Sequence, residues 1–189
     1  MENITAKTFY FLRHGQTDWN LQGRLQGSID VSLNGTGRQQ ARDSVSAVEK
    51  LGVQYIVTSP LKRTFQTAEI INETLQLPLV KDERLKERSF GSYEKCLKQD
   101  IIKKHNLQKG DLIEDYLPED AEPLEEASER IVQAVAEHTQ NKGENILFVG
   151  HGVLMRALMH SLGISRFGIK NAAPYKFFNK DNQWHMEQL

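Results

Sequence analysis

FYFLRHG, at residues 9–15, is the stretch around which the chain is organised. Its aromatic and aliphatic residues show no helical period, which predicts a short buried strand. The strand ends abruptly at Arg13, His14 and Gly15, where glycine permits a sharp turn and leaves room for a ligand. In open α/β sheets ligands bind beyond the carboxyl ends of parallel strands. A cation and an imidazole at this point therefore favour an anionic ligand.

Two other stretches end in a comparable way, YIVTSPLKR at 55–63 and ILFVGHG at 146–152. If the three strands are parallel neighbours joined by right-handed crossovers, His14, Arg63 and His151 emerge at the same edge of the sheet. Cationic groups placed so close together repel one another unless an anion lies between them. The sequence therefore predicts a site for phosphate or for a phosphorylated molecule, with positive potential added by the N-termini of the helices that follow.

Helical patterns separate these strands. Ser59 as N-cap and Pro60 at the first helical position predict a helix start that places Arg63 in the first turn. We expect helices at residues 35–51, 60–75, 97–105, 124–138 and 152–162, and further strands near 79–80, 175–178 and 183–186. This alternation of strand and helix is typical of an α/β protein.

The composition is that of a soluble globular protein, with 189 residues, 39% hydrophobic and 26% charged. We expect one domain over residues 1–189. The net charge of -1 provides no general attraction to nucleic acid or to an anionic membrane. Cys96 is the single cysteine, which excludes an internal disulfide and a cysteine-based zinc site. No stretch has the length and apolarity of a signal peptide or a membrane span, so we expect a cytoplasmic protein.

Residues 92–122 form an insertion whose residues 96–122 are the least regular part of the chain, with many lysines in the first half and an acidic patch in the second. This insertion is either a solvated surface segment or a lid over the predicted site. As a lid, this segment would contact the part of the substrate that carries the phosphate.

A metal site is the main alternative for the histidines. His14 and Asp18 are four residues apart, and His151 would be a third ligand. Arg13 and Arg63 would repel a cation in the same cavity, so we expect no metal. The chain also lacks a GxxxxGK[ST] phosphate loop.

Several ordered motifs give a family resemblance. They are RHGQTDWN at 13–20, GRLQG at 23–27, SLNGTGRQQA at 32–41, TSPLKRTFQTAEII at 58–71, LKERSFG at 85–91 and GHGVLMRAL at 150–158. In this order they resemble the histidine phosphatase superfamily, the phosphoglycerate-mutase-like group, over most of the chain. The resemblance implies a three-layer α/β/α sandwich with a mixed, mostly parallel sheet of about six strands.

The resemblance also implies roles for individual residues. His14 matches the family's nucleophile, which carries a phosphohistidine, and Glu87 matches the proton donor to the leaving oxygen. The groups that hold the phosphoryl oxygens match Arg13, Arg63 and His151, and the rest of the pocket matches Asn20, Gln26 and Gly27. A nucleophilic imidazole must be neutral, and we expect a backbone carbonyl to accept its other ring proton. No metal or cofactor is implied, because arginines supply the positive charge.

The resemblance leaves the type of phosphoryl transfer open. True mutases of the family resemble a longer chain with a larger insertion, whereas here only residues 88–123 lie between Glu87 and Leu124. We therefore expect a phosphatase acting on a small phosphorylated metabolite, with mutase activity as the alternative. A weakly catalytic phospho-ligand binder is a further alternative, although such a protein would be expected to lack His14 or Glu87. The natural substrate and the oligomeric state are not readable from the sequence.

Overall fold

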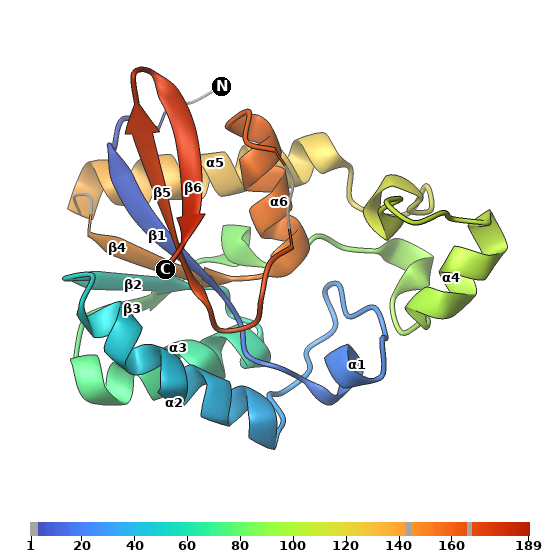
Figure 1. Cartoon of the computed structure of the whole chain (residues 1–189), viewed down its shortest axis with the longest axis horizontal. Coiled ribbons are helices and arrows are strands. Elements are labelled where there is room, and N and C mark those ends of the chain that lie inside the picture. Colours follow the sequence, from blue (N-terminus) through green and yellow to red (C-terminus); the bar gives the residue numbers. More distant parts are fainter. Residues whose placement is uncertain (1–3, 143–144, 166–167) are drawn as a thin grey trace.

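The computed structural model describes residues 4–142, 145–165 and 168–189. Its centre is a six-stranded mixed sheet in the order β3-β2-β4-β1-β5-β6 (Figure 1). The strands are β1 (Thr8–Arg13), β2 (Tyr55–Thr58), β3 (Leu79–Lys81), β4 (Ile146–Gly150), β5 (Pro174–Lys180) and β6 (Gln183–Gln188). The first four are mutually parallel, and β5 and β6 add an antiparallel hairpin next to β1. The predicted mixed, mostly parallel sheet is confirmed.

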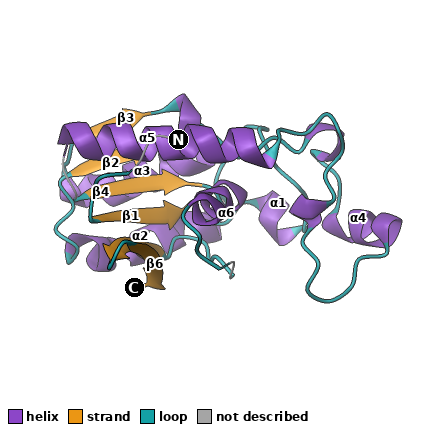
Figure 2. Cartoon of the chain, turned by 90° about the horizontal axis from the view of Figure 1, so that it is seen from above, coloured by secondary structure: helices purple, strands orange, loops and turns teal. Residues whose placement is uncertain are grey.

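Helices cover both faces of this sheet. The α-helices are α1 (Asp18–Leu21), α2 (Gly35–Glu49), α3 (Lys62–Leu75), α4 (Lys98–His105), α5 (Leu124–Lys142) and α6 (Gly152–Ser161). Short 3₁₀ turns lie at η1 (Glu83–Leu85), η2 (Gly91–Tyr93) and η3 (Ile113–Asp115). Helices α2 and α3 pack on one face and α5 and α6 on the other (Figures 1 and 2). The three-layer α/β/α sandwich is therefore confirmed.

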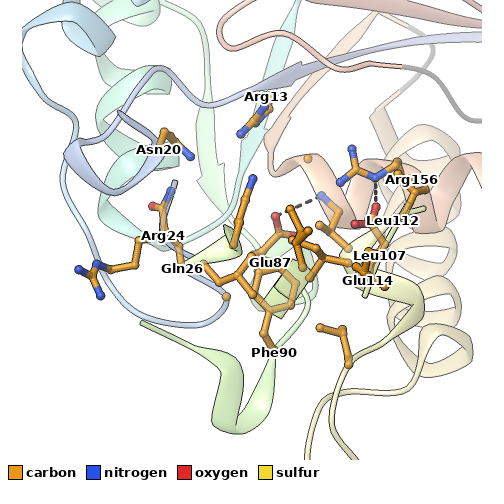
Figure 3. A pocket seen from close by; sticks show the side chains of 18 of the residues that line it. Arg13, Asn20, Arg24, Gln26, Glu87, Phe90, Leu107, Leu112, Glu114 and Arg156 are labelled. Atoms are coloured by element: carbon orange, nitrogen blue, oxygen red, sulfur yellow. Dashed lines mark hydrogen bonds and ion pairs between the residues drawn. The ribbon is translucent and has the colours of Figure 1, made fainter. Parts of the chain in front are cut away.

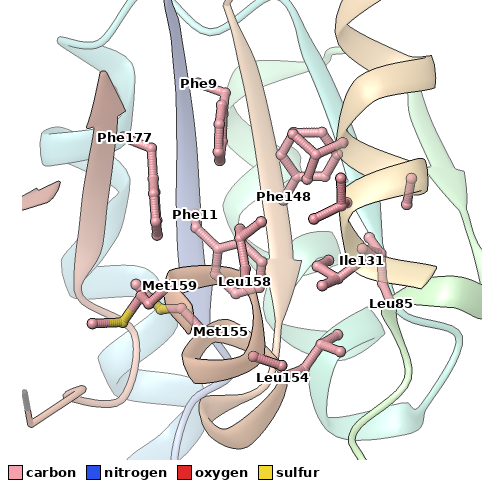
Figure 4. Packing of buried hydrophobic residues seen from close by; sticks show 14 of the residues in the cluster. Phe9, Phe11, Leu85, Ile131, Phe148, Leu154, Met155, Leu158, Met159 and Phe177 are labelled. Atoms are coloured by element: carbon pink, nitrogen blue, oxygen red, sulfur yellow. The ribbon is translucent and has the colours of Figure 1, made fainter. Parts of the chain in front are cut away.

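The opening strand supplies the core on both faces because its side chains alternate. Phe9 and Phe11 point toward α5 and α6 and pack with Phe148 and Phe177 (Figure 4). The rings of Phe9 and Phe177 are stacked with centroids 4.9 Å apart. Leu12, with its neighbour Tyr10, belongs to the other core cluster, beneath α2 and α3. Burial of each such side chain contributes about 1.5–3 kcal/mol, which fixes β1 at the centre of the sheet.

The strand register brings the polar ends of the parallel strands to one level. Arg13 of β1 pairs with Gly150 of β4, and Thr58 of β2 pairs with Val149. The pairing continues one residue further, where the His14 amide donates to the Gly150 carbonyl at 3.0 Å. The three predicted strand ends therefore meet at the same edge.

Helix α3 begins later than the sequence predicts. Its first residue is Lys62 and its N-cap is Leu61, so the prediction of Ser59 as N-cap and Pro60 as the first helical residue is wrong. The Ser59 hydroxyl instead accepts the Leu61 amide at 3.3 Å, in the turn that precedes the helix, and contacts the His151 ring at 2.9 Å. Arg63 still falls in the first turn, as predicted.

The loop after β1 contains a helix that the sequence analysis did not predict. Helix α1 has only four residues and is held by a capping box, in which Thr17 Oγ1 accepts from the Asn20 amide and Asn20 Oδ1 accepts from the Thr17 amide. Helix α5 also extends to Lys142, beyond the predicted end at residue 138.

The 92–122 segment, which contains α4 and η3, projects from the sandwich beside α1 (Figures 1 and 2). A third core cluster joins it to the rest of the protein, because Tyr93 and Ile101 of the segment pack with Leu25, Phe90 and Val153. Main-chain bonds tie it to the loop after α1, because the Leu25 amide donates to Cys96 and the Lys98 amide donates to Gly23. No helix in the described ranges is long and apolar enough to cross a membrane.

Candidate active site

A cavity of about 350 Å³ opens at the edge where β1, β2 and β4 end (Figure 3). One wall comes from the ends of the parallel strands and the other from the 92–122 segment. Among its lining residues are Arg13, His14, Asn20, Arg24, Gln26, Gly27, Arg63, Glu87, Phe90, Lys98, Ile102, Leu112, Glu114, Gly152 and Arg156. Most of the predicted site residues therefore line a single cavity.

His14 lies at the base of the cavity and is 3% exposed. Its Nδ1 lies 2.7 Å from the Gly15 carbonyl oxygen, which can only accept, so Nδ1 carries the proton and Nε2 is left with its lone pair. Burial, together with the charges of Arg63 and Arg13, lowers the His14 pKa well below 6.5. His14 is thus a neutral imidazole, as expected for a nucleophile, and its other proton is held by the backbone.

Arg13 is the last residue of β1 and directly precedes His14. One of its Nη1 protons is donated to the Ile169 carbonyl at 2.9 Å, whereas its buried Nε has no partner among the described residues. A Cβ at Gly152 would lie only 3.2 Å from this Nε, so a side chain there would crowd the guanidinium. The unpaired buried donor is suited to an anionic oxygen.

Arg63 and His151 form one hydrogen-bonded unit, and both are fully buried. Arg63 Nε donates to His151 Nδ1 at 3.2 Å, and its two Nη groups donate to the carbonyls of Ile29 and Gly27 at 2.7 and 2.8 Å. Burial is the main reason that the pKa of Arg63 falls to about 10, so the group keeps its charge at neutral pH. Burial and the Arg63 charge also lower the pKa of His151 well below 6.5.

Glu87 reaches the cavity from the loop between η1 and η2. Its Oε1 accepts the amides of Arg88 and Leu154 at 3.0 and 2.8 Å, and its Oε2 accepts the Val153 amide at 3.2 Å. The N-terminus of α6 therefore fixes the carboxyl group. Glu87 lines the same cavity as His14, and its charge acts on Arg13 and Arg63.

The three other predicted pocket residues also line the cavity. Asn20 uses Oδ1 in the capping box of α1, so its Nδ2 amide is left for a ligand. Gln26 is 6% exposed, and its Oε1 is a buried acceptor without a partner among the described residues. Gly27 has a φ of 51°, and a Cβ at this position would collide with the Glu94 carboxylate. Glycine avoids both the strain of this φ and the need for Glu94 to move, and the Gly27 carbonyl is one of those that hold Arg63.

Sequence reasoning missed an ion pair at the far end of the cavity. Arg156 on α6 pairs through Nε with Glu114 of η3, as the dashed line in Figure 3 shows. The Glu114 carbonyl also accepts from Arg88 Nη1 at 3.2 Å. Arg156 stands in the GHGVLMRAL motif, but no spacing rule indicated that its partner would come from the insertion. Lys98 of α4 also lines this end, where burial and the charges of Arg13 and Arg156 lower its pKa.

The alternative metal site is not assembled. Asp18 is exposed at the start of α1, whereas His14 and His151 are buried. Within the described ranges no group of three or more His, Cys, Asp or Glu side chains is placed to hold a metal ion. The two rings instead lie next to arginines.

Comparison with known sequences identifies relatives over most of the chain. The sequence model of the Histidine phosphatase superfamily (branch 1) matches residues 9–189. The chain is 40% identical over 149 residues to an uncharacterized phosphatase, PhoE, of Bacillus subtilis, covering 78% of this chain and 73% of the relative. It is 31% identical over 185 residues to a probable phosphoglycerate mutase, GpmB, of Salmonella arizonae, covering 93% of this chain and 86% of the relative.

Solved structures share the architecture. Bacillus stearothermophilus YhfR superimposes with a TM-score of 0.83 at 27% identity, covering 97% of this chain and 96% of that one. A mycobacterial glucosyl-3-phosphoglycerate phosphatase, solved in complex with VO3, has a TM-score of 0.83 at 25% identity, covering 97% of this chain and 98% of that one. With its motifs, fold and relatives in agreement, the chain belongs to the histidine phosphatase superfamily.

Proposed function

We propose that the protein is a metal-independent phosphomonoester hydrolase that works through a phosphohistidine on His14. The observation that carries the proposal is the state of the His14 ring. Its Nδ1 proton is held by the Gly15 carbonyl, and its neutral Nε2 lies in the cavity beside Arg13 and Arg63. A nucleophile of this kind needs no separate base, because it carries no proton on the attacking atom.

In the first step, Nε2 of His14 attacks phosphorus and the bond to the leaving oxygen breaks. Glu87 in its acid form gives its proton to that oxygen, so the product departs as an alcohol and Glu87 becomes a carboxylate. In the second step a water molecule attacks the phosphohistidine, and Glu87 takes the proton that the water loses. The N–P bond breaks, inorganic phosphate leaves, and His14 and Glu87 return to their starting states.

Positive charge around the phosphoryl group is assigned to Arg13 and Arg63, and His151, which is neutral, is assigned to the same phosphoryl site as the residue hydrogen-bonded to Arg63. The charge that spreads over the equatorial oxygens in the transition state is stabilised by preorganised donors. Arg13 Nε is buried without a partner among the described residues, and Arg63 retains one N–H on each Nη after its carbonyl contacts. These guanidinium donors take the place that a metal ion has in other phosphatases.

The substrate proposed is a small phosphorylated metabolite whose phosphoryl group binds at the His14 end. Asn20, Gln26 and Gly27 would surround the phosphoryl group and the first atoms of the leaving group. We further propose that residues 1–189 form one domain in which residues 92–122 act as a lid. Lid side chains, among them Lys98, Ile102 and Glu114, line the end of the cavity that the leaving group would occupy.

Hydrolysis is favoured over mutase activity for two reasons. The insertion between Glu87 and Leu124 is short, so it would shield a phosphohistidine from water less than a longer insertion would. The 40% identical relative is named a phosphatase, whereas the relatives named as probable mutases are 31–32% identical. Both names occur among the relatives, so the distinction has to be made by assay.

The assay compares phosphate release with phosphoryl transfer. With p-nitrophenyl phosphate and a chelator present, the purified protein is expected to turn over at its normal rate. With a phosphoglycerate, the expected product is inorganic phosphate in amounts equal to the substrate lost. Interconversion of phosphoglycerate isomers with little phosphate release would establish the mutase instead, and loss of turnover with chelator would contradict the metal-independent mechanism.

A further inference from the structure

The ring of His151 is held on both sides by buried side chains. Arg63 Nε lies 3.2 Å from Nδ1, and Ser59 Oγ lies 2.9 Å from Nε2. All three residues are 0% exposed. Ser59 was expected to cap a helix, and neither the family motifs as matched above nor the proposed chemistry gives its hydroxyl a function.

These contacts decide where the His151 proton lies. An arginine Nε–H can only donate, so Nδ1 of His151 must accept and carries no proton. A neutral imidazole has one proton, which therefore sits on Nε2 and is donated to the Ser59 hydroxyl oxygen. The lowered pKa of the buried ring agrees with the neutral form.

The tautomer of His151 in turn orients Arg63. Three of the five N–H donors of the Arg63 guanidinium are used by His151, Ile29 and Gly27. Because a guanidinium is planar, three acceptors in its plane fix both its position and its rotation. The directions of the two remaining N–H bonds are therefore fixed by the protein in the absence of a ligand. The charge of Arg63 is felt at His14, whose pKa it lowers, so the fixed guanidinium lies close to the nucleophile.

We propose that Ser59 is a positioning residue for the phosphoryl site, acting on Arg63 through the proton on His151 Nε2. This inference rests on the proposed function only in taking phosphate as the ligand of Arg63. Without the hydroxyl, the Nε2–H of His151 would be buried without an acceptor. The other neutral tautomer would relieve this, but it would place an Nδ1–H against the Arg63 Nε–H.

Either outcome raises the free energy of the site. The rearrangement with the smallest free-energy cost is a rotation of the Arg63 guanidinium away from His151. A buried donor left unpaired costs about 1–3 kcal/mol, which corresponds to an effect on binding between about 5-fold and about 150-fold. Ser59→Ala is therefore expected to weaken binding of inorganic phosphate about tenfold.

The test uses the full chain labelled with ¹⁵N-histidine, with the His151 signals assigned by their loss in His151→Gln. In the wild type, His151 is expected to show a protonated Nε2 and an unprotonated Nδ1. In Ser59→Ala this single tautomer is expected to be lost. Ser59→Cys, which keeps the side-chain size but has a weaker acceptor, provides a second variant if Ser59→Ala fails to fold.

Thr58→Val is the matched control. It removes a neighbouring, fully buried hydroxyl that donates to the Ser59 carbonyl and does not contact His151. Its His151 tautomer is expected to be that of the wild type. Its phosphate affinity is expected to stay within about twofold of the wild-type value, since no donor near Arg63 changes. In an Arg63→Lys background, Ser59→Ala should produce little further loss of phosphate affinity, because the group through which it acts is gone.

An unchanged His151 tautomer and unchanged phosphate affinity in both Ser59 variants would overturn the proposal. So would a full tenfold loss that persists in the Arg63→Lys background. These readouts require no turnover. The absence of a phosphohistidine would therefore refute the proposed function but would not affect the test of Ser59, which depends on the histidine signals.

Discussion

The rings of His14 and His151 lie 5.3 Å apart between centroids, at an interplanar angle of 62°, although 137 positions separate them in the sequence numbering. Their strands, β1 and β4, are parallel neighbours in register. Each ring is buried and is uncharged because burial and the adjacent arginines disfavour a further cation. The site therefore holds fixed positive charge on guanidinium groups and neutral nitrogen on both imidazoles.

This pair makes the fold sensitive to acid. The pKa of each histidine is 6.5 when unperturbed and lies well below that in the folded protein. Below about pH 6.5 the unfolded chain therefore binds protons that the folded protein does not, and stability falls as the pH falls. Each histidine contributes a slope of about 1.4 kcal/mol per pH unit in this window and nothing well above it.

His14→Gln isolates the contribution of one ring. Urea unfolding of the wild type and of this variant, measured between about pH 5 and pH 8, should give slopes that differ by one proton on the acid side of the histidine range. Carboxylates elsewhere affect both proteins equally. Parallel stability curves for the two proteins would show that His14 is not neutral in the fold.

Glu87→Gln tests the proton donor. General acid catalysis contributes about 10²–10⁴-fold, so kcat/KM for an alkyl phosphate is expected to fall by that factor. This parameter covers the steps up to departure of the leaving group and excludes the later hydrolysis of the phosphohistidine, in which Glu87 acts as base. The loss should be much smaller for p-nitrophenyl phosphate, because nitrophenolate leaves without a proton. Glu83→Gln is the control, since Glu83 stands in η1, just before the loop that carries Glu87, and forms an ion pair with Lys86. Equal losses for the two substrates would remove Glu87 from the role of acid.

Glu114→Gln tests whether the ion pair at the far end of the cavity affects selectivity for the charge of the leaving group. Glu114 neutralises Arg156, and its removal leaves a guanidinium without its carboxylate in the cavity wall. For substrates with a second anionic group, kcat/KM is expected to rise about tenfold relative to uncharged leaving groups. The lid should stay in place, because Arg88 holds the Glu114 carbonyl rather than its side chain. Exposed Glu119→Gln, in the same segment, should leave the ratio unchanged. An unchanged ratio in Glu114→Gln would show that the pair does not contact the leaving group.

Gly27→Ala separates steric from conformational effects. Gly27 and Gly23 both have positive φ, 51° and 68°, so alanine at either position costs about 1–2 kcal/mol of backbone strain. Only at position 27 would the methyl group meet the Glu94 carboxylate and displace a carbonyl that holds Arg63. Calorimetric titration should show phosphate affinity reduced about tenfold or more in Gly27→Ala and nearly unchanged in Gly23→Ala. Equal affinities in the two variants would contradict the assigned contact.

The sequence was sufficient for the positions of the strands and for the convergence of His14, Arg63 and His151, whereas the mixed six-stranded sheet was implied by the family resemblance. Those inferences depend on strand periodicity and on parallel strands ending at one edge, which are local and topological rules. Glu87 was found only through the family resemblance, because a loop carboxylate has no spacing signal. Its actual support, the amides at the start of α6, comes from a segment more than sixty positions away.

The errors have a physical cause in long-range contacts. Ser59 was interpreted as a helix cap because serine before proline usually caps, but its hydroxyl is shared between the Leu61 amide, in the turn before α3, and the His151 ring. Arg156 and Glu114 could not be paired from the sequence, since their contact depends on how the 92–122 segment folds back over the cavity. Local sequence rules fail for side chains whose contacts are with residues far away in the sequence.

The most direct test is to trap the phosphorylated protein. Wild-type protein mixed with a ³²P-labelled phosphomonoester and quenched within milliseconds should carry one label that is stable in alkali, labile in acid and located on His14 by peptide mapping. His14→Ala should carry no label and should lose turnover. A label on another residue, or ordinary turnover by His14→Ala, would contradict nucleophilic attack by His14.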